Sequence, residues 1–541
     1  MKRYILFTII AFGFMLISCD KFLEENPTGS LTSESTLTSR DAGIALATGA
    51  YRSLYPILEG AETNGSTLNN GFEFPTGKSY AATADQWLYL YETDAVTGDL
   101  SYFRLTWNLW YQGVRDCNLA IKMIPTINGM TADDKSLYLG EVRTLRAFYY
   151  FCLVRYFGDV VLNTSVIDDI TKVQKPRSSL KTIYDKVIIP DLEFAVNESK
   201  LADAPSSNGR VTKYVARMIL ADVYLNCAGY PYQEVNSDTT KNWCSDGLWT
   251  ASQYPVNAPG AKEFLKKSQT QLNTLYGKYK LGTYRDLNKP ELNNKGEAIF
   301  QAQFLSSANY NKLVWKILQI GSQTSLNNEE YGTYVPSTAY YNSFNAGDKR
   351  IQNRQMFFYS DTKSTKYDPN EGPAPAFYMA YLFKFYDSLA IKKTTYSSLN
   401  WNFYRYAEVL LMLTEVNWSL QQLGESVSEN DLVKGINEVR ARALLPTYVG
   451  ADLSLQKIMS ERAYELIYEN KMLWDMRRTR RALKDGSGEF TALEPLVGHQ
   501  PSNFSFKFTA KHLLSAISAT EIDNNKNVLQ NFGYTPLQTG Q

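Results

Sequence analysis

The stretch EVRTLRAFYYFCLVRYF, residues 141–157, places apolar side chains at intervals of three and four. The repeating positions are Val142, Leu145, Tyr149, Cys152, Leu153 and Tyr156. Side chains at this spacing share one side of an α-helix, so the stretch predicts a helix with a buried face. Gly158 follows at once and is expected to end that helix, because glycine accepts the backbone conformation that helix C-termini favour.

The same spacing recurs along the chain and indicates a mainly helical protein. Helices are predicted over Trp107–Ile124, Ser179–Ser199, Thr212–Ala228, Arg405–Leu423, Leu432–Ala443 and Met459–Arg477, the last as one long helix. Pro190 is expected to kink or divide the second of these, because its ring removes a helical hydrogen bond. Residues Gly60–Gly77 are expected to form a loop. Strand-like stretches are few, and the best are Ala298–Phe304 and Tyr381–Tyr386.

Consecutive helices joined by short turns predict a particular architecture. We expect mainly α structure, with tetratricopeptide-like stacked helix pairs, long irregular loops and a few short strands. The segments Gly229–Gly260 and Ser306–Thr395 are rich in Asn, Gly, Pro, Ser and Tyr and are the longest irregular ones. Long loops in an ordered protein are often functional, so function is expected there rather than on the helices.

The N-terminus has the pattern of a secretion signal. Lys2 and Arg3 precede the apolar run Tyr4–Ile17, which is too short for a comfortable membrane span of about 20 residues. Leu16-Ile17-Ser18-Cys19 then looks like a bacterial lipobox. We therefore expect a signal peptide over residues 1–18 and a lipidated tether over 19–39, with the lipid on Cys19. The alternative is an ordinary secretion signal followed by an incidental cysteine.

Motifs that carry catalysis are scarce. The two histidines are His499 and His512, and the chain has no His-Glu-x-x-His, Gly-x-Ser-x-Gly or Cys-x-x-Cys motif. Gly71–Ser79 resembles a phosphate-binding loop but has one residue too many between its glycines, so we interpret it as a turn. The net charge of +1, without a long basic stripe, gives no reason to expect nucleic acid. The sequence thus predicts no metal site and no cofactor, and favours binding over catalysis.

Cys117, Cys152 and Cys227 lie in helical patterns among apolar residues. We interpret them as small buried hydrophobic side chains, although the sequence leaves a disulfide open.

A series of motifs resembles the SusD/RagB family. They are Leu145–Phe151 with Leu153–Val160, Gly209–Lys213 with Ala221–Leu225, Asn294–Phe304, Asp348–Arg350, Tyr404–Met412, Ile436–Ala443, Glu461–Glu469, Trp474–Arg477, Asn527–Asn531 and Gly533–Tyr534. Each motif alone is loose, but their order and spacing together are specific. The resemblance covers essentially the whole chain after Cys19.

This resemblance implies a surface lipoprotein of Bacteroidetes-type bacteria, with residues 40–541 as one globule whose halves are about 40–260 and 261–541. It implies a protein that is not an enzyme. It would bind a nutrient, usually a glycan, as the lid of a SusC-like TonB-dependent outer-membrane transporter, anchored by its lipid and facing the extracellular side. Three alternatives stay open: a surface-anchored glycan hydrolase, a peptide-binding RagB-like lid, and a structural cap without its own ligand.

The ligand site is expected in two aromatic-rich loops. Sugars offer C–H faces to aromatic rings and hydroxyls to polar side chains. The resemblance places the glycan platform on comparable early and middle loops, so the predicted stacking residues are Trp87, Tyr310, Trp315 and Tyr331, and the predicted hydrogen-bonding residues are Asp85, Gln86 and Asn311. The alternative is that Trp87, Tyr89 and Tyr91, which alternate like a strand, are packed in the core.

A set of charged residues recurs within the C-terminal helices. They are Glu408, Arg440, Arg442, Glu461, Arg462, Glu465 and Glu469. We interpret them as an inter-helix ion-pair network rather than a ligand site, because charges on a buried helix face must be paired.

Overall fold

A computed structural model of the chain describes residues 39–54, 68–80, 86–167, 169, 173–233, 253–305, 335–360, 379–387, 390 and 397–534. The helices in this part are α3 (Arg40–Gly49), α4 (Leu68–Glu73), α5 (Gln86–Glu92), α6 (Ser101–Met123), α7 (Ala132–Phe157), α8 (Leu180–Ile183), α9 (Ile189–Asn197), α10 (Lys213–Cys227), α11 (Tyr230–Gln233), α12 (Pro259–Leu275), α14 (Thr338–Asn342), α16 (Tyr406–Gln422), α17 (Glu429–Arg442), α18 (Leu455–Glu465), α19 (Met472–Thr479) and α20 (Ala519–Asn524). None of these described helices is long and apolar enough to cross a membrane.

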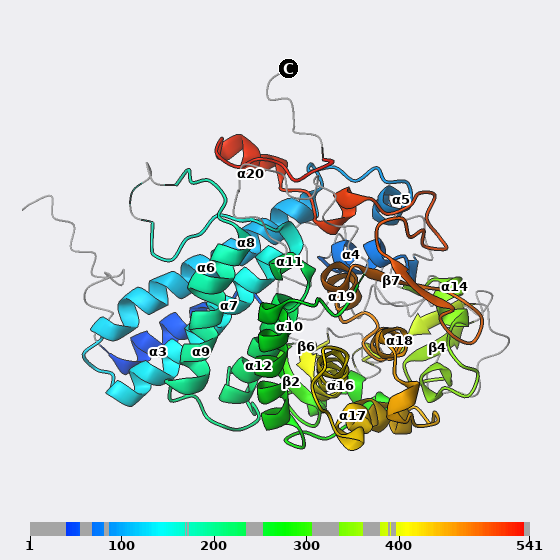
Figure 1. Cartoon of the computed structure of the whole chain (residues 1–541). Helices are drawn as coiled ribbons and strands as arrows, with labels where there is room; N and C mark the ends of the chain where they lie inside the picture. The colour runs from blue at the N-terminus through cyan, green and yellow to red at the C-terminus, as the bar shows by residue number, and fades with distance from the viewer. Residues whose placement is uncertain are drawn as a thin grey trace, which may run out of the picture.

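The long helices stack in chain order, as predicted. Contacts run from α6 to α7, then to α9, α10, α12, α16 and α17, so each helix packs on the one before it. Figure 1 shows this row passing from α6 and α7 at one end of the molecule through α10 and α12 to α16 and α17, with shorter helices and strands gathered beyond it. The prediction of stacked helix pairs is confirmed.

The strands are short and pair in antiparallel twos. They are β1 (Ser79–Tyr80) with β3 (Val335–Pro336), β2 (Ala298–Ala302) with β6 (Trp401–Arg405), β4 (Phe357–Ser360) with β5 (Met379–Leu382), and β7 (Arg481–Lys484) with β8 (Ala492–Pro495). The predicted strand Ala298–Phe304 is therefore confirmed except for its last two residues. The predicted strand Tyr381–Tyr386 overlaps β5 only at its start.

The stretch from Glu141 to Phe157 forms the second half of α7, and nearly all of it is buried. Gly158 ends the helix with a φ of +75°, as its position predicted. Trp110 of α6 and Tyr149 and Tyr156 of α7 are fully buried, since α7 packs against α6, α3 and α9. Cys117, Cys152 and Cys227 are buried free thiols, which confirms their interpretation as small hydrophobic side chains. Burial raises the pKa of all three thiols.

Proline divides the segment after Ser179 as predicted. A π-helical turn, Tyr184–Ile188, separates α8 from α9, and Pro190 lies in the first turn of α9. The π-helical turn accommodates the proline, because it interrupts the α-helical hydrogen-bond ladder directly before Pro190.

Two expectations about the chain course are wrong. Part of Gly60–Gly77, expected as a loop, forms α4 and a 3-10 turn over Phe74–Thr76, because Phe72 and Phe74 are buried in the core. The helix expected over Met459–Arg477 is two helices, α18 and α19. Between the two helices, two residues adopt the left-handed backbone conformation, with φ of +57° at Tyr468 and +59° at Asn470.

Candidate functional site

Most of the predicted ligand residues lie outside the part of the chain that the structure describes. This holds for Asp85, Tyr310, Asn311, Trp315 and Tyr331. Gln86 and Trp87 begin α5, but their side chains also lie outside the part of the chain that the structure describes.

The strand-like alternation read at Trp87, Tyr89 and Tyr91 is wrong, because α5 is a helix from Gln86 to Glu92. Leu88 is 4% exposed and its neighbour Tyr89 is 61% exposed, so α5 buries one side and presents the other to solvent.

The ladder β1–β3 pairs two strands that border the predicted binding segments in sequence. Tyr80 pairs with Val335 and Ser79 with Pro336 in antiparallel register. The chain leaves β1 after Tyr80 and enters β3 at Val335, so residues 81–85 and 306–334 attach to the same end of one ladder. Two regions far apart in sequence therefore start from adjacent points.

Buried polar contacts hold the ladder in place. Lys78 O accepts a hydrogen bond from Ser337 N at 2.7 Å, which continues the pairing. The Lys78 ammonium is buried and donates to Asp485 Oδ1 at 2.6 Å and to Leu483 O at 2.9 Å, next to β7. Burial lowers the pKa of Lys78, and Asp485 opposes that shift. Tyr468 OH donates to Val335 O on the other strand.

Gly77 makes the approach to β1 possible. Its φ is +70°, and a Cβ there would lie 2.3 Å from Pro501 Cβ, so only glycine fits. The interpretation of Gly71–Ser79 as a turn is confirmed over Phe74–Gly77, where a 3-10 turn ends at this glycine, whereas Gly71–Glu73 belongs to α4 and Ser79 to β1.

Aromatic rings pack beside the ladder where α14 follows β3. Tyr464 and Phe490 stack with ring centroids 4.9 Å apart, and Tyr340 of α14 stacks on Phe490 at 6.1 Å. Ser337 begins α14 and its hydroxyl accepts from Tyr340 N. These contacts make the base of the ladder rigid.

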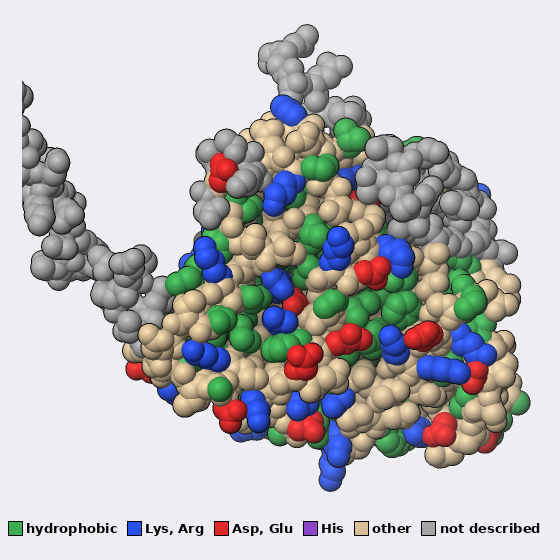
Figure 2. Space-filling view, turned by 60° about the vertical axis from the view of Figure 1, so that its left-hand side comes forward, with side chains coloured by type: hydrophobic (Ala, Val, Ile, Leu, Met, Phe, Trp, Pro, Cys, Tyr) green, Lys and Arg blue, Asp and Glu red, His purple; other side chains and the backbone are tan. Residues whose placement is uncertain are grey.

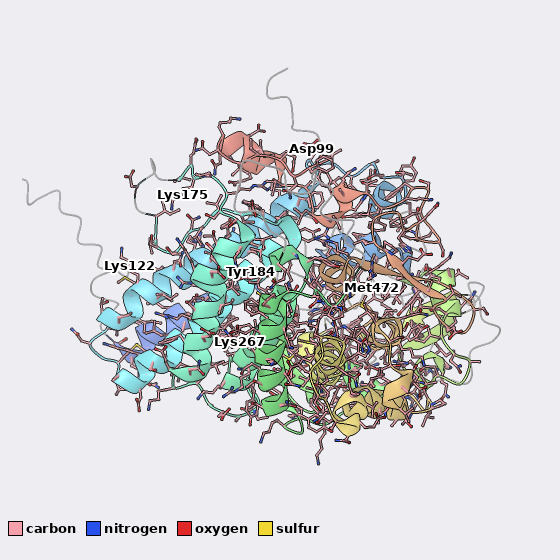
Figure 3. All side chains as sticks on the ribbon, in the orientation of Figure 1. Asp99, Lys122, Lys175, Tyr184, Lys267 and Met472 are labelled. Carbon is pink, nitrogen blue, oxygen red and sulfur yellow. The ribbon has the colours of Figure 1, made fainter. Side chains whose placement is uncertain are left out.

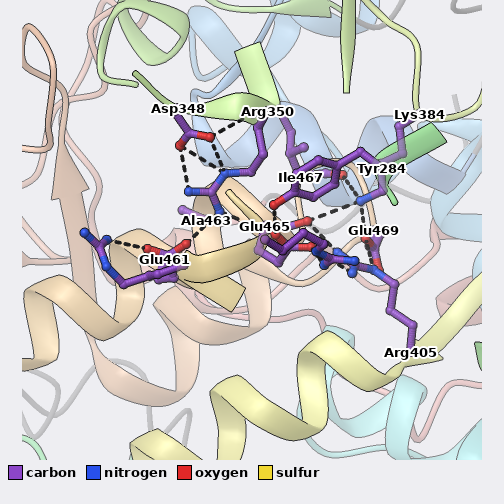
Figure 4. Close-up of polar contacts among 12 residues, drawn as sticks. Tyr284, Asp348, Arg350, Lys384, Arg405, Glu461, Ala463, Glu465, Ile467 and Glu469 are labelled. Carbon is purple, nitrogen blue, oxygen red and sulfur yellow. Dashed lines mark hydrogen bonds and ion pairs between the residues drawn. The ribbon is translucent and has the colours of Figure 1, made fainter. Parts of the chain in front are cut away.

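A buried ion-pair network, shown in Figure 4, ties this region to the helical row. Arg350 is fully buried and contacts Asp348 Oδ2 at 2.7 Å and Glu461 Oε1 at 2.7 Å. Arg405, at the start of α16, contacts three carboxylates. They are Glu469 at 2.8 Å, Glu465 at 2.8 Å and Glu297 at 3.1 Å.

The remaining cations complete this network. Arg442 pairs with Glu297 and Glu465, Arg440 pairs with Glu461, and Lys384 pairs with Glu469. The five cations match five carboxylates, namely Arg350, Lys384, Arg405, Arg440 and Arg442 against Glu297, Asp348, Glu461, Glu465 and Glu469. Because the charges balance, the cluster can be buried without leaving one uncompensated.

The break between α18 and α19 provides backbone carbonyls that accept hydrogen bonds from the cations of this network. Arg405 donates to Glu465 O, and Lys384 donates to Ile467 O at 3.2 Å. A continuous helix would use these carbonyls internally. Burial alone would raise the pKa of Glu465, but Arg442, Arg405 and Arg350 lower it to about 2. Burial lowers the pKa of Lys384 to about 8 against the pull of Glu469.

The predicted ion-pair network is therefore confirmed. Glu408 and Arg462 belong to an adjoining group, in which Lys471 contacts Glu408 at 2.8 Å and Arg462 contacts Asp475 at 2.8 Å. These charges hold helices together, and the cavities that Arg462 and Lys471 line have volumes of only about 20 and 40 Å³. No group of three or more His, Cys, Asp or Glu in the described ranges is arranged to hold a metal ion.

Sequence reasoning missed the residues that support the site, above all the pairing of Tyr80 with Val335. Gly77-Lys78-Ser79 was visible as a turn, but a turn motif does not identify its distant partner strand. Figure 2 shows positive and negative side chains interspersed over one face, in agreement with the lack of a basic stripe in the sequence.

Comparison with known proteins gives matches along most of the chain. Residues 296–534 match the SusD family, and residues 21–225 match a family described as starch-binding and associating with the outer membrane. The SusD-like protein P38 of Formosa agariphila is 25% identical over 511 residues, which cover 88% of this chain and 91% of that protein.

Solved structures give the same result. A SusD superfamily protein from Parabacteroides distasonis is 30% identical, with a TM-score of 0.78 over 93% of this chain and all of that one. The surface glycan-binding protein A from Bacteroides thetaiotaomicron, solved in complex with laminarihexaose, is 19% identical, with a TM-score of 0.67 over 91% of this chain and all of that one. The second likeness is one of fold.

Proposed function

Because this chain belongs to the SusD superfamily, we propose that it is a cell-surface protein that binds an oligosaccharide and does not cleave it. We propose further that it acts as the lid of a SusC-like TonB-dependent transporter. The family description that matches residues 21–225 refers to starch and the outer membrane, and one structural neighbour was solved with laminarihexaose. Both support a glycan as the ligand class.

One observation of this chain carries the proposal, namely the β1–β3 ladder. The segment with Asp85, Gln86 and Trp87 follows this ladder after Tyr80, and the segment with Tyr310, Asn311, Trp315 and Tyr331 precedes it before Val335. Flat rings and planar polar groups drawn from two segments on one rigid base suit a sugar chain, which needs stacking and hydrogen bonds together.

The proposed tether leads into a capped helix. The Ser39 side chain caps α3 by accepting from Ala42 N, so the last residue of the proposed tether 19–39 is already fixed to the globule. We propose that lipid on Cys19 holds the globule 40–541 at the outer membrane, facing outward. Two or more acyl chains would make that attachment stable.

The test is calorimetric titration of the mature chain with laminarin and with starch oligosaccharides. Trp87→Ala and Trp315→Ala should each weaken binding sharply while the melting temperature stays nearly unchanged. Phe532→Ala is the matched control, since it removes an aromatic side chain that is 37% exposed at the C-terminal end. Unchanged affinity in both tryptophan variants would place the site elsewhere.

A reducing-sugar assay on the same preparation separates the alternatives. Release of reducing ends from any glycan would contradict the proposal and support a surface-anchored hydrolase. Binding of peptides with no binding of glycans would support a RagB-like peptide lid.

A further inference from the structure

We propose that the groove between α6, residues 161–167 with Val173, and α20 is a second saccharide site, sized for a neutral disaccharide. The groove has a volume of about 440 Å³, within the range of ~300–1,000 Å³ that small-molecule sites occupy. It shares no lining residue with the β1–β3 ladder, and Figure 1 places α6 and α20 away from α14 and β4. The proposal takes only its ligand class from the proposed function.

The walls of the groove are held in place by hydrogen bonds. Tyr111 OH donates to Val161 O at 2.7 Å, and Asn118 Nδ2 donates to Asn163 O at 2.9 Å, so α6 is tied to the facing segment. Figure 3 marks Lys175 on the continuation of that segment, above α6. Asn525 Nδ2, just after α20, donates to Lys175 O at 3.0 Å. A ligand would therefore meet a preformed site and incur little cost in ordering it.

The floor combines the partly buried ring of Tyr111 with one carboxylate, and the buried Trp107 supports that ring from behind. Trp107 and Tyr111 lie one helical turn apart, with ring centroids separated by 4.9 Å. Glu521 lines the end of the groove and hydrogen-bonds with Trp107 and with Asn525. A partly buried carboxylate is a strong acceptor for sugar hydroxyls, and it disfavours an anionic ligand.

The open side of the groove presents planar polar groups on successive turns of α6. Asn108 and Gln112 are exposed carboxamides, and Arg115 follows them one turn later. A carboxamide both donates and accepts, so it can match a hydroxyl, which does the same. Arg115 contacts the neighbouring Asp116 at 2.8 Å, so the open side of the groove does not present an isolated positive charge.

The facing rim is aliphatic. Ile167 is 39% exposed and Val173 is 47% exposed, and both line the groove. They offer a surface for the C–H face of a sugar ring. A peptide is less well served, because the described lining comes from α6, residues 161–167, Val173 and the α20 region, and among these residues there is no strand edge to extend.

The experiment uses the mature chain with maltose, cellobiose and laminaribiose as separate probes, followed by saturation-transfer NMR and titration calorimetry. The double variant Asn108→Ala and Gln112→Ala should lower the affinity for the disaccharide about tenfold, because it loses two modest hydrogen bonds. Ser165→Trp, at an exposed lining position, should block the groove and abolish that binding. Gln422→Ala removes an exposed helical carboxamide from α16 and should change nothing.

The outcomes separate this site from the loop site. Trp87→Ala and Trp315→Ala should leave disaccharide binding in the groove intact, even where they abolish binding of laminarihexaose. If those two variants have no effect but Ser165→Trp does, the groove stands and the proposed loop site fails. The groove proposal is overturned if none of the three disaccharides binds, if Ser165→Trp leaves their binding unchanged, or if a Val-Ile dipeptide binds there and the sugars do not.

Discussion

Replacement of Arg405 by methionine is expected to destabilise the protein mainly through the carboxylates it leaves behind. The side chain is fully buried and contacts Glu469, Glu465 and Glu297. Methionine keeps much of the volume but none of the charge. Removal of one partner from a buried ion pair costs about 3–5 kcal/mol, because the other charge stays buried without compensation.

The expected fall in melting temperature follows from the size of the chain. Unfolding gains about 2.1 cal/mol/K per residue, which over 541 residues is about 1.1 kcal/mol/K. Arg405→Met should therefore lower Tm by about 3–5 °C, measured by differential scanning calorimetry near pH 7. Lys266→Met is the control. It breaks an exposed pair with Glu425 and should shift Tm by less than about 1 °C.

The pH dependence gives a sharper test. The pKa of Glu465 is about 2 in the folded protein, below its ordinary value of 4.5. It therefore contributes stability that is fully present above pH 4.5 and is lost as the pH falls toward 2. Without Arg405 the pKa values of Glu465 and Glu469 rise, and protonation relieves the uncompensated charge. The Tm deficit of the variant should be smaller near pH 5 than near pH 7.

A second substitution should restore part of the loss. Glu469→Gln in the Arg405→Met background restores the balance of the network, with four cations against four carboxylates, and the glutamine oxygen can still accept from Lys384. The double variant should therefore melt higher than Arg405→Met alone. The reasoning would be refuted if Arg405→Met were no more harmful than Lys266→Met, or if its Tm deficit grew toward acidic pH.

Three further outcomes are expected. Gly435→Ala should destabilise the α16–α17 contact by about 1–3 kcal/mol in denaturant unfolding, because its Cβ would lie 2.2 Å from Leu410 O, whereas Gly49→Ala meets no atom within 4 Å and should be neutral or slightly stabilising. Cys19→Ala should release the protein from the outer membrane or leave it unprocessed, and unchanged acyl labelling would contradict the lipid assignment. Gentle solubilisation of native membranes should recover a TonB-dependent barrel with this chain, and repeated failure to find one would argue against the lid.

The sequence alone determined the helical row. Apolar positions in α7, α10, α16 and α17 repeat at the helical period, and Gly158 and Pro190 act as predicted, because these effects depend on neighbours within a few residues. The charged positions of α17 and α18 were also predictable as a network, since buried charges need partners. The sequence did not show which carboxylate meets which guanidinium.

The tertiary structure decided what joins residues distant in the chain. Tyr80 meets Val335 across 255 residues of sequence, although neither strand of two residues has a sequence signal of its own. The expected single helix over Met459–Arg477 is divided in two, because Arg405 and Lys384 donate hydrogen bonds to the backbone carbonyls of Glu465 and Ile467, where α18 ends. Such contacts are selected by the packing of the whole fold, and local periodicity contains no information about them.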